Sequence, residues 1–167
     1  MSLSTLKVRI YGDPCLRKKC VPVKKIGPSE RMVINAMIET MHQAKGVGLA
    51  APQVGISQRF FVLDIGDGPM VIINPEIIKK TGSSVFEEGC LSVPENTFMI
   101  ERPEEITVRY MDENNQEMKL ACDGLLARVI QHETDHLEGV LIVDYASDEE
   151  KAKFKEQFGI LEAEQKE

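Results

Sequence analysis

Apolar residues recur at helical spacing in two segments of the chain, where positions three and four residues apart share one face. The first segment starts near Ser29, a residue type that caps helices, and ends at residue 44. The second follows Asp123, another candidate cap, and stops at Gly139. Its apolar stripe consists of Leu125, Leu126, Val129, Ile130 and Leu137. We therefore predict two helices that each bury one face against a core.

Shorter segments rich in β-branched or aromatic residues alternate with turn sequences and predict strands. These segments are residues 6–10, 59–65, 70–78, 105–111, 116–122 and 140–143. Most turns between them are too short for the crossover that a parallel pair needs. A last helix, acidic with interleaved lysines, is expected from Asp148. The pattern therefore predicts an α+β fold in which antiparallel strands pack against helices.

Length and composition are those of one globular domain. We expect residues 1–147 to form its main body and residues 148–167 an acidic helical tail of the same domain. The net charge of −7 and the absence of Trp disfavour nucleic acid, including specific DNA binding. No run of 18 apolar residues and no secretory signal is present, which predicts a cytoplasmic protein without a membrane partner.

The second predicted helix carries the sequence His-Glu-Thr-Asp-His at residues 132–136. Histidines four residues apart lie on one helix face, so His132 and His136 can bind one metal ion. Glu133 between them can then act as a base. The alternative is a solvated helix face with incidental histidines.

A catalytic metal site usually has three protein ligands and one water, so a third ligand is needed. The open candidates are a downstream acid, His42 or a cysteine, the acids being Glu150, Glu156 and Glu162. The acids belong to a helix that is charged overall, as expected of a solvated face. Cys90 is the strongest candidate, because Gly89 before it lets the backbone bring the thiolate close to a cation.

Residues 46–53 (GVGLAAPQ) join the first helix to the strands through small side chains. They lack the Lys-Ser/Thr pair of a phosphate-binding loop and do not follow a strand. Small residues can line a narrow cleft, in which Gln53 could offer an amide donor to a reacting carbonyl. A tight connecting loop is the equally weighted alternative.

Three segments together resemble the three motifs of peptide deformylases, in the same order and at the usual separations. They are residues 46–53, 88–92 (EGCLS) and 131–137 (QHETDHL). The resemblance covers roughly residues 6–146. It implies a catalytic domain over residues 1–147, with antiparallel strands around a central helix that carries the His-Glu-x-x-His motif. It also implies removal of the formyl group from the N-terminal formylmethionine of new polypeptides, with release of formate.

By the same resemblance, the metal ligands are Cys90, His132 and His136, with a water in the fourth position. Glu133 becomes the general base and acid. The side-chain amide of Gln53 and the backbone N–H of Leu91 stabilise the charge on the formyl oxygen. The native ion is expected to be Fe(II), with Zn(II), Ni(II) or Co(II) as substitutes.

The resemblance also implies an apolar pocket for the methionine side chain, and its residues are Val47, Phe86, Leu125 and Val129. The backbone of Gly48 and Leu49 would pair with the extended substrate peptide. Plain core packing is the alternative role for Leu125 and Val47.

Two features depart from the family pattern. Residues 95–98 lack a basic residue that some relatives have, and the tail is more acidic than the helix by which some members dock on the ribosome. The ribosome is thus a candidate partner whose docking through the tail is open. Rival functions are a zinc endopeptidase with a downstream acid as third ligand, and a non-catalytic metal-binding or ribosome-associated module.

Overall fold

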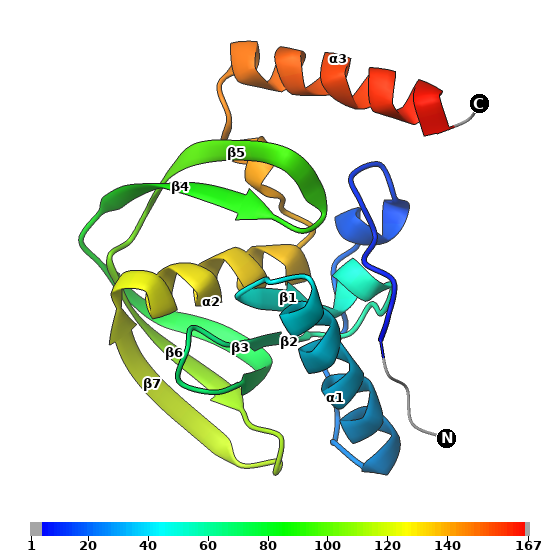
Figure 1. Cartoon of the computed structure of the whole chain (residues 1–167). Coiled ribbons are helices and arrows are strands. Elements are labelled where there is room, and N and C mark those ends of the chain that lie inside the picture. Colours follow the sequence, from blue (N-terminus) through cyan, green and yellow to red (C-terminus); the bar gives the residue numbers. More distant parts are fainter. Residues whose placement is uncertain (1–4, 166–167) are drawn as a thin grey trace.

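Two antiparallel sheets lie on opposite sides of one helix in the computed structural model, which describes residues 5–165 and the side chains up to residue 159 (Figure 1). The helices are α1 (Pro28–Gln43), α2 (Gly124–Leu137) and α3 (Asp148–Gln165), with 3-10 turns η1 (Pro14–Arg17), η2 (Ala51–Val54) and η3 (Ile142–Tyr145). The larger sheet has the order β1-β2-β3-β6-β7 and the smaller one pairs β4 with β5. The strands are β1 (Gly48–Ala50), β2 (Phe60–Leu63), β3 (Met70–Thr81), β4 (Ser84–Cys90), β5 (Val93–Arg102), β6 (Glu105–Met111) and β7 (Glu117–Asp123).

Helix α2 lies between the two sheets because it buries one face on each. Ala127, Ile130 and Leu137 are fully buried and pack on residues of the larger sheet such as Phe61 and Val108. Truncating a fully buried leucine or isoleucine costs about 2–5 kcal/mol, so this packing holds α2 firmly. The remaining face of α2 is left to meet β4 and β5.

The β4–β5 hairpin has a core of its own, shared with the C-terminal part of the chain. Val93, Phe98 and Ile100 of β5 are buried together with residues of η3 and with Phe154 of α3. The ring of Phe154 meets the ring of Tyr11 edge-on, at 4.8 Å between centroids. Helix α3 therefore packs on the body of the protein through aromatic contacts, above β5 in Figure 1.

The sequence pattern predicted much of this architecture. The α+β fold, the antiparallel pairing of every neighbouring strand pair, both periodic helices and the acidic helix from Asp148 are confirmed. The predicted strands at 59–65, 70–78, 105–111 and 116–122 correspond to β2, β3, β6 and β7. Helix α1 is capped at Gly27 rather than near Ser29, because the Glu30 side chain accepts the Gly27 N–H at 3.1 Å.

Two predicted strands are wrong. Residues 6–10 form no strand; Arg9 N–H instead donates to the carbonyl of Gln53 at 2.6 Å. Residues 140–143 enter η3, whose first turn is fixed because Asp144 accepts the Leu141 N–H at 2.9 Å. None of the helices in the described part of the chain has both the length and the apolar content needed to cross a membrane.

The β4–β5 hairpin was missed by the pattern. Two of the positions that it buries are charged, since Glu88 and Arg102 are only 6% and 4% exposed. Charged residues normally indicate a solvated position, so the buried face of these strands could not be recognised before the ion pair between Glu88 and Arg102 was known.

Candidate active site

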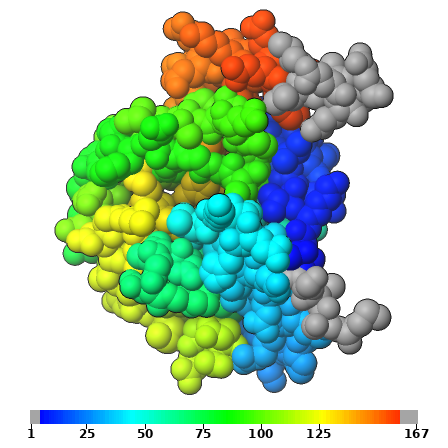
Figure 2. Space-filling view, in the orientation of Figure 1, coloured from blue at the N-terminus to red at the C-terminus, as the bar shows by residue number. Residues whose placement is uncertain are grey.

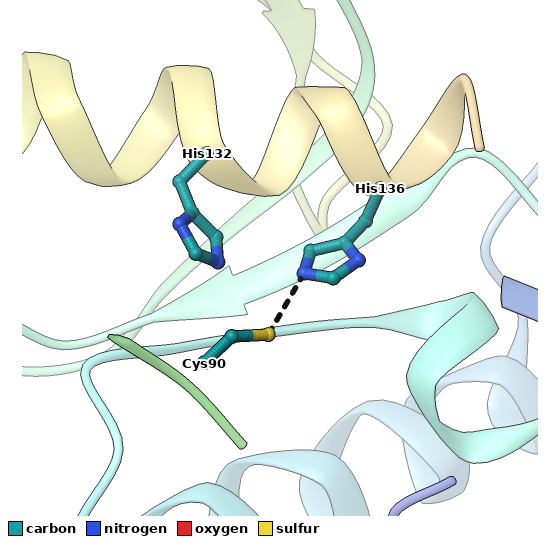
Figure 3. Close-up of side chains that lie close together, drawn as sticks. All are labelled: Cys90, His132 and His136. Carbon is teal, nitrogen blue, oxygen red and sulfur yellow. Dashed lines mark hydrogen bonds between the residues drawn. The ribbon is translucent and has the colours of Figure 1, made fainter. Parts of the chain in front are cut away.

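Cys90, His132 and His136 come together between α2 and the end of β4 (Figure 3). One helical turn separates the two histidines, and both rings point from α2 toward the sulfur. One ligand atom from each of the three residues lies within 4.8 Å of the others, and His136 Nε2 is 3.4 Å from Cys90 Sγ. Among the described residues, this is the one group of three such side chains close enough to hold a metal ion.

The donor set of this site fits a metal ion. Thiolate sulfur and imidazole nitrogen both suit zinc and iron, and a catalytic site has three protein ligands and leaves a fourth position open. Burial lowers the pKa of His136 well below its usual value, which keeps its ring neutral and able to coordinate. Cys90, His132 and His136 thus present, close together, the donor atoms of the ligands that the sequence predicted.

Glu133 lies beside this group and is 3% exposed. Its Oε2 is 3.9 Å from His132 Nε2, and its buried Oε1 has no hydrogen-bond partner among the described residues. Unpartnered buried oxygens are rare and mark a place for water or a ligand group. Burial raises the pKa of Glu133 to about 7. A carboxylate with that pKa is suited both to accept and to return a proton near neutral pH.

A buried carboxylate that the sequence analysis did not single out holds His132. Glu88 Oε1 accepts the Nδ1–H of His132 at 2.9 Å, which leaves Nε2 for the metal side. Arg102 donates to both oxygens of Glu88, at 2.6 and 2.9 Å. Burial raises the pKa of Glu88, but the hydrogen bonds from His132 and Arg102 outweigh it and lower the pKa to about 2. Glu88 is thus an anion that orients the imidazole.

A cavity of about 390 Å³ opens beside this cluster. Figure 2 shows the hollow where the β4–β5 hairpin, α2 and the segment around β1 meet. Cys90 and His132 line the cavity, whereas His136 does not. Glu133 and six further residues that the sequence predicted for the site line it as well. These six are Val47, Gly48, Gln53, Leu91, Leu125 and Val129. Lys45, Glu87 and Arg128 also line it and were not predicted.

Two other predicted residues do not line the cavity. The side chain of Leu49 is fully buried in the core beneath β1. Phe86 is 58% exposed, and its ring lies against the guanidinium of Arg128, at 5.2 Å from Cζ to the ring centroid. Phe86 therefore adjoins the cavity through Arg128.

Gln53 lies close to the sulfur. Its Nε2 donates to Ser92 Oγ at 3.0 Å and is 3.6 Å from Cys90 Sγ, while its Oε1 accepts the Ala50 N–H at 2.9 Å. The bond to Ala50 turns the amide nitrogen toward the cavity side. Gly48 is equally constrained, because a Cβ there would come within 2.7 Å of Glu133 Oε2. Only a glycine leaves room for the carboxylate.

The alternative third ligands take no part in the cluster. His42 Nε2 pairs with Asp64 at 2.8 Å. Glu150 accepts the Ser147 N–H at 3.2 Å, and Glu156 is exposed on α3. The side chain of Glu162 lies outside the described residues. Cys90 is the candidate that the fold brings to the histidines.

The fold and site together define a metal-dependent hydrolase, in which a Cys-His-His donor set and a buried glutamate face a narrow cleft. The chain belongs to the polypeptide deformylase family, whose sequence model matches residues 5–152. Members of that family are metal-dependent enzymes that remove N-formyl groups from nascent peptides.

Individual relatives agree with this assignment. The peptide deformylase of Thermotoga petrophila is 52% identical over 142 residues, which are 84% of this chain and 87% of that protein. The crystal structure of peptide deformylase from Thermotoga maritima superposes with a TM-score of 0.84 at 51% identity, covering 86% of this chain and 98% of that one. That of Synechococcus elongatus, in complex with actinonin, gives a TM-score of 0.88 at 42% identity, covering 95% and 88%.

Proposed function

We propose that this chain hydrolyses the formyl amide at the N-terminal methionine of new polypeptides and releases formate. The observation that carries the proposal is the convergence of Cys90, His132 and His136 beside Glu133 in a cleft. Family membership supports the same reaction. One divalent ion would be held between α2 and the end of β4 by Cys90, His132 and His136.

A bound divalent ion supplies Lewis acidity and lowers the pKa of a coordinated water. Glu133 accepts the proton of the attacking water and returns it to the amine that leaves when the formyl C–N bond breaks. The amide of Gln53 and the N–H of Leu91 stabilise the negative charge that develops on the formyl oxygen. Glu88 keeps His132 oriented throughout.

The substrate peptide is proposed to extend along β1. This strand is at the edge of the larger sheet and pairs on one side with β2, so its other side can accept a peptide strand at Gly48 and Leu49. The methionine side chain would lie among Val47, Leu125 and Val129, with Phe86 beyond Arg128. Such apolar side chains suit a thioether.

The native ion is proposed to be Fe(II). A thiolate and two imidazoles suit Zn(II) and Fe(II) alike, and Ni(II) or Co(II) can replace them. A ferrous ion beside a thiolate is sensitive to oxygen. Activity should therefore decay in air and persist with Ni(II) or Co(II). Equal decay rates with and without oxygen would argue for Zn(II).

The test is anaerobic release of formate from formyl-Met-Ala-Ser, run beside metal analysis of the same samples. Cys90→Ala should lose both bound metal and activity, whereas Cys122→Ala, a half-buried cysteine on β7, should keep both. An endopeptidase with a downstream acid as ligand would keep its metal in Cys90→Ala. Metal-replete, reduced wild-type protein that releases no formate would contradict the proposal and favour a non-catalytic module.

Ribosome docking is a separate proposal. Acidic residues outnumber lysines on α3, and this charge opposes contact with RNA phosphates. We expect α3 to contribute nothing to sedimentation with ribosomes. Wild-type protein that pellets with ribosomes, when a variant carrying Lys153→Ala and Lys155→Ala at exposed positions of α3 does not, would show the opposite.

A further inference from the structure

Arg128 is a buried arginine at the wall of the cleft, one turn before His132 on α2. It is 9% exposed and its guanidinium bonds in several directions. Nη1 donates to Glu88 Oε2 and, at 3.1 Å, to the carbonyl of Ile100. Nη2 donates to the carbonyl and the hydroxyl of Ser84, at 2.9 and 3.1 Å. One side chain therefore ties α2 to both strands of the β4–β5 hairpin.

The guanidinium carbon Cζ of the same side chain lies over the ring of Phe86, 5.2 Å from the ring centroid. Phe86 and Glu88 are two residues apart on β4, so they share the inward face of the hairpin. Yet Phe86 is 58% exposed, so core packing alone does not fix its ring. A cation over an aromatic face is attractive, and the planar guanidinium can stack while its edges make hydrogen bonds.

We infer that Arg128 is a positioning residue for the first side chain of the substrate. It holds Phe86, which lies beyond the residues that line the cavity, at the outer end of the methionine pocket, and it connects Phe86 to Glu88, the carboxylate that orients His132. The inference rests on the proposed function, since it assigns a selectivity to that reaction. A fixed aromatic wall favours a long apolar first side chain over a short one, which cannot reach it.

Selectivity is the readout that separates this role from simple support of the fold. The ratio of kcat/KM for formyl-Met-Ala-Ser to that for formyl-Ala-Ala-Ser cancels any loss common to both substrates, including a loss that acts through Glu88 and His132. Phe86→Ala should lower this ratio about 3- to 5-fold, the effect of roughly one methylene group of the substrate no longer being buried against the ring. Arg128→Met, which keeps the length of the side chain but loses its planar cation, should lower the ratio equally.

The double variant completes the test. If Arg128 acts through Phe86, the double variant should show the ratio of the single variants, with no further decrease. Arg109→Met, at an exposed arginine of β6, is the matched control and should leave the ratio at its wild-type value. Arg128→Lys keeps a cation for Glu88 but not a flat face, so it carries the same test if Arg128→Met does not fold.

Each outcome decides the inference. An unchanged ratio in folded Arg128→Met or Arg128→Lys protein overturns it, and so does an additive decrease in the double variant. Wild-type protein that releases no formate from either peptide overturns the proposed function, and the inference with it. Wild-type activity with an unchanged ratio in the variants overturns the inference alone.

Discussion

The Nδ1–H of His132 donates to Oε1 of Glu88 at 2.9 Å, although 44 positions separate the two residues in sequence. This bond joins α2 to the hairpin that supplies Cys90, so the same contact that orients one candidate ligand also fixes the distance to another. Arg102 in turn donates to both oxygens of Glu88, which fixes the carboxylate that orients the ring.

Glu88→Gln should weaken metal binding and destabilise the fold. The neutral amide keeps the size of the side chain but leaves Arg102 and Arg128 without their buried anion, a change that costs about 3–5 kcal/mol. Loss of such an orienting group reduces metal affinity about 10- to 100-fold. Chelator competition and urea unfolding measure the two effects. Glu101→Gln, on the solvent side of the same hairpin, should change neither, and wild-type affinity in Glu88→Gln would refute this role.

Gly48→Ala should abolish most activity without unfolding the protein. The added Cβ would lie 2.7 Å from Oε2 and 3.0 Å from Cγ of Glu133, so the carboxylate must leave its position. General acid–base catalysis contributes about 10²–10⁴-fold, and we expect a loss of kcat/KM in that range. The metal content should stay at the wild-type level. Gly159→Ala, on open surface of α3, is the control, and near-normal activity in Gly48→Ala would show that Glu133 can work from elsewhere.

The site residues that lie together on α2 could be predicted from the spacing of residues in the sequence. His132 and His136 follow from helical spacing, and Glu133 from its place between them. Cys90, on another element, was predicted from Gly89 before it and from the family resemblance, whereas the charged partners Glu88, Arg102 and Arg128 were not, because charged residues are normally assigned to the surface. Their burial depends on ion pairs between β4, β5 and α2, which no local periodicity encodes.

The strands likewise divide into those that the local sequence reveals and those that depend on contacts between elements. Strands β2, β3, β6 and β7 have apolar positions and turns that reveal them locally, whereas β4 and β5 bury an ion pair. Residues 6–10 have the composition of a strand, but no neighbouring strand pairs with them. Composition therefore predicts whether a segment can be extended, and tertiary pairing decides whether it becomes part of a sheet.

The ion pair between Arg17 and Asp144 should make stability depend on pH in the acid range. Burial raises the pKa of Asp144, but hydrogen bonds from Arg17 and the Leu141 N–H outweigh it and lower the pKa below its usual value. A lowered pKa means that the carboxylate stabilises the fold above the usual carboxyl pKa near 4 and that this stabilisation is lost as pH falls further.

Asp144→Asn should therefore unfold more easily at pH 7, by up to about 1 kcal/mol because the pair is partly exposed. The difference from wild type should shrink as pH falls from 5 to 3. Urea unfolding of both proteins at each pH gives the difference, in which effects common to the two cancel. Asp67→Asn, at an exposed turn, should show no such trend. A difference that grows toward low pH would contradict the assigned direction.

We propose that residues 148–167 belong to the same domain as residues 1–147, and Phe154→Ala tests this. Residues 1–4 and 166–167 of these ranges lie outside the part of the chain that the structure describes. Phe154 is 4% exposed and contacts Tyr11 and Phe98, so its truncation should lower the free energy of unfolding by about 3–5 kcal/mol. Hydrogen exchange should quicken along α3 and also in β5, because Phe98 loses its cover. Lys153→Ala, an exposed neighbour on α3, should alter neither quantity. If α3 were an independent appendage, Phe154→Ala would speed exchange in α3 alone and leave the global unfolding free energy at its wild-type value.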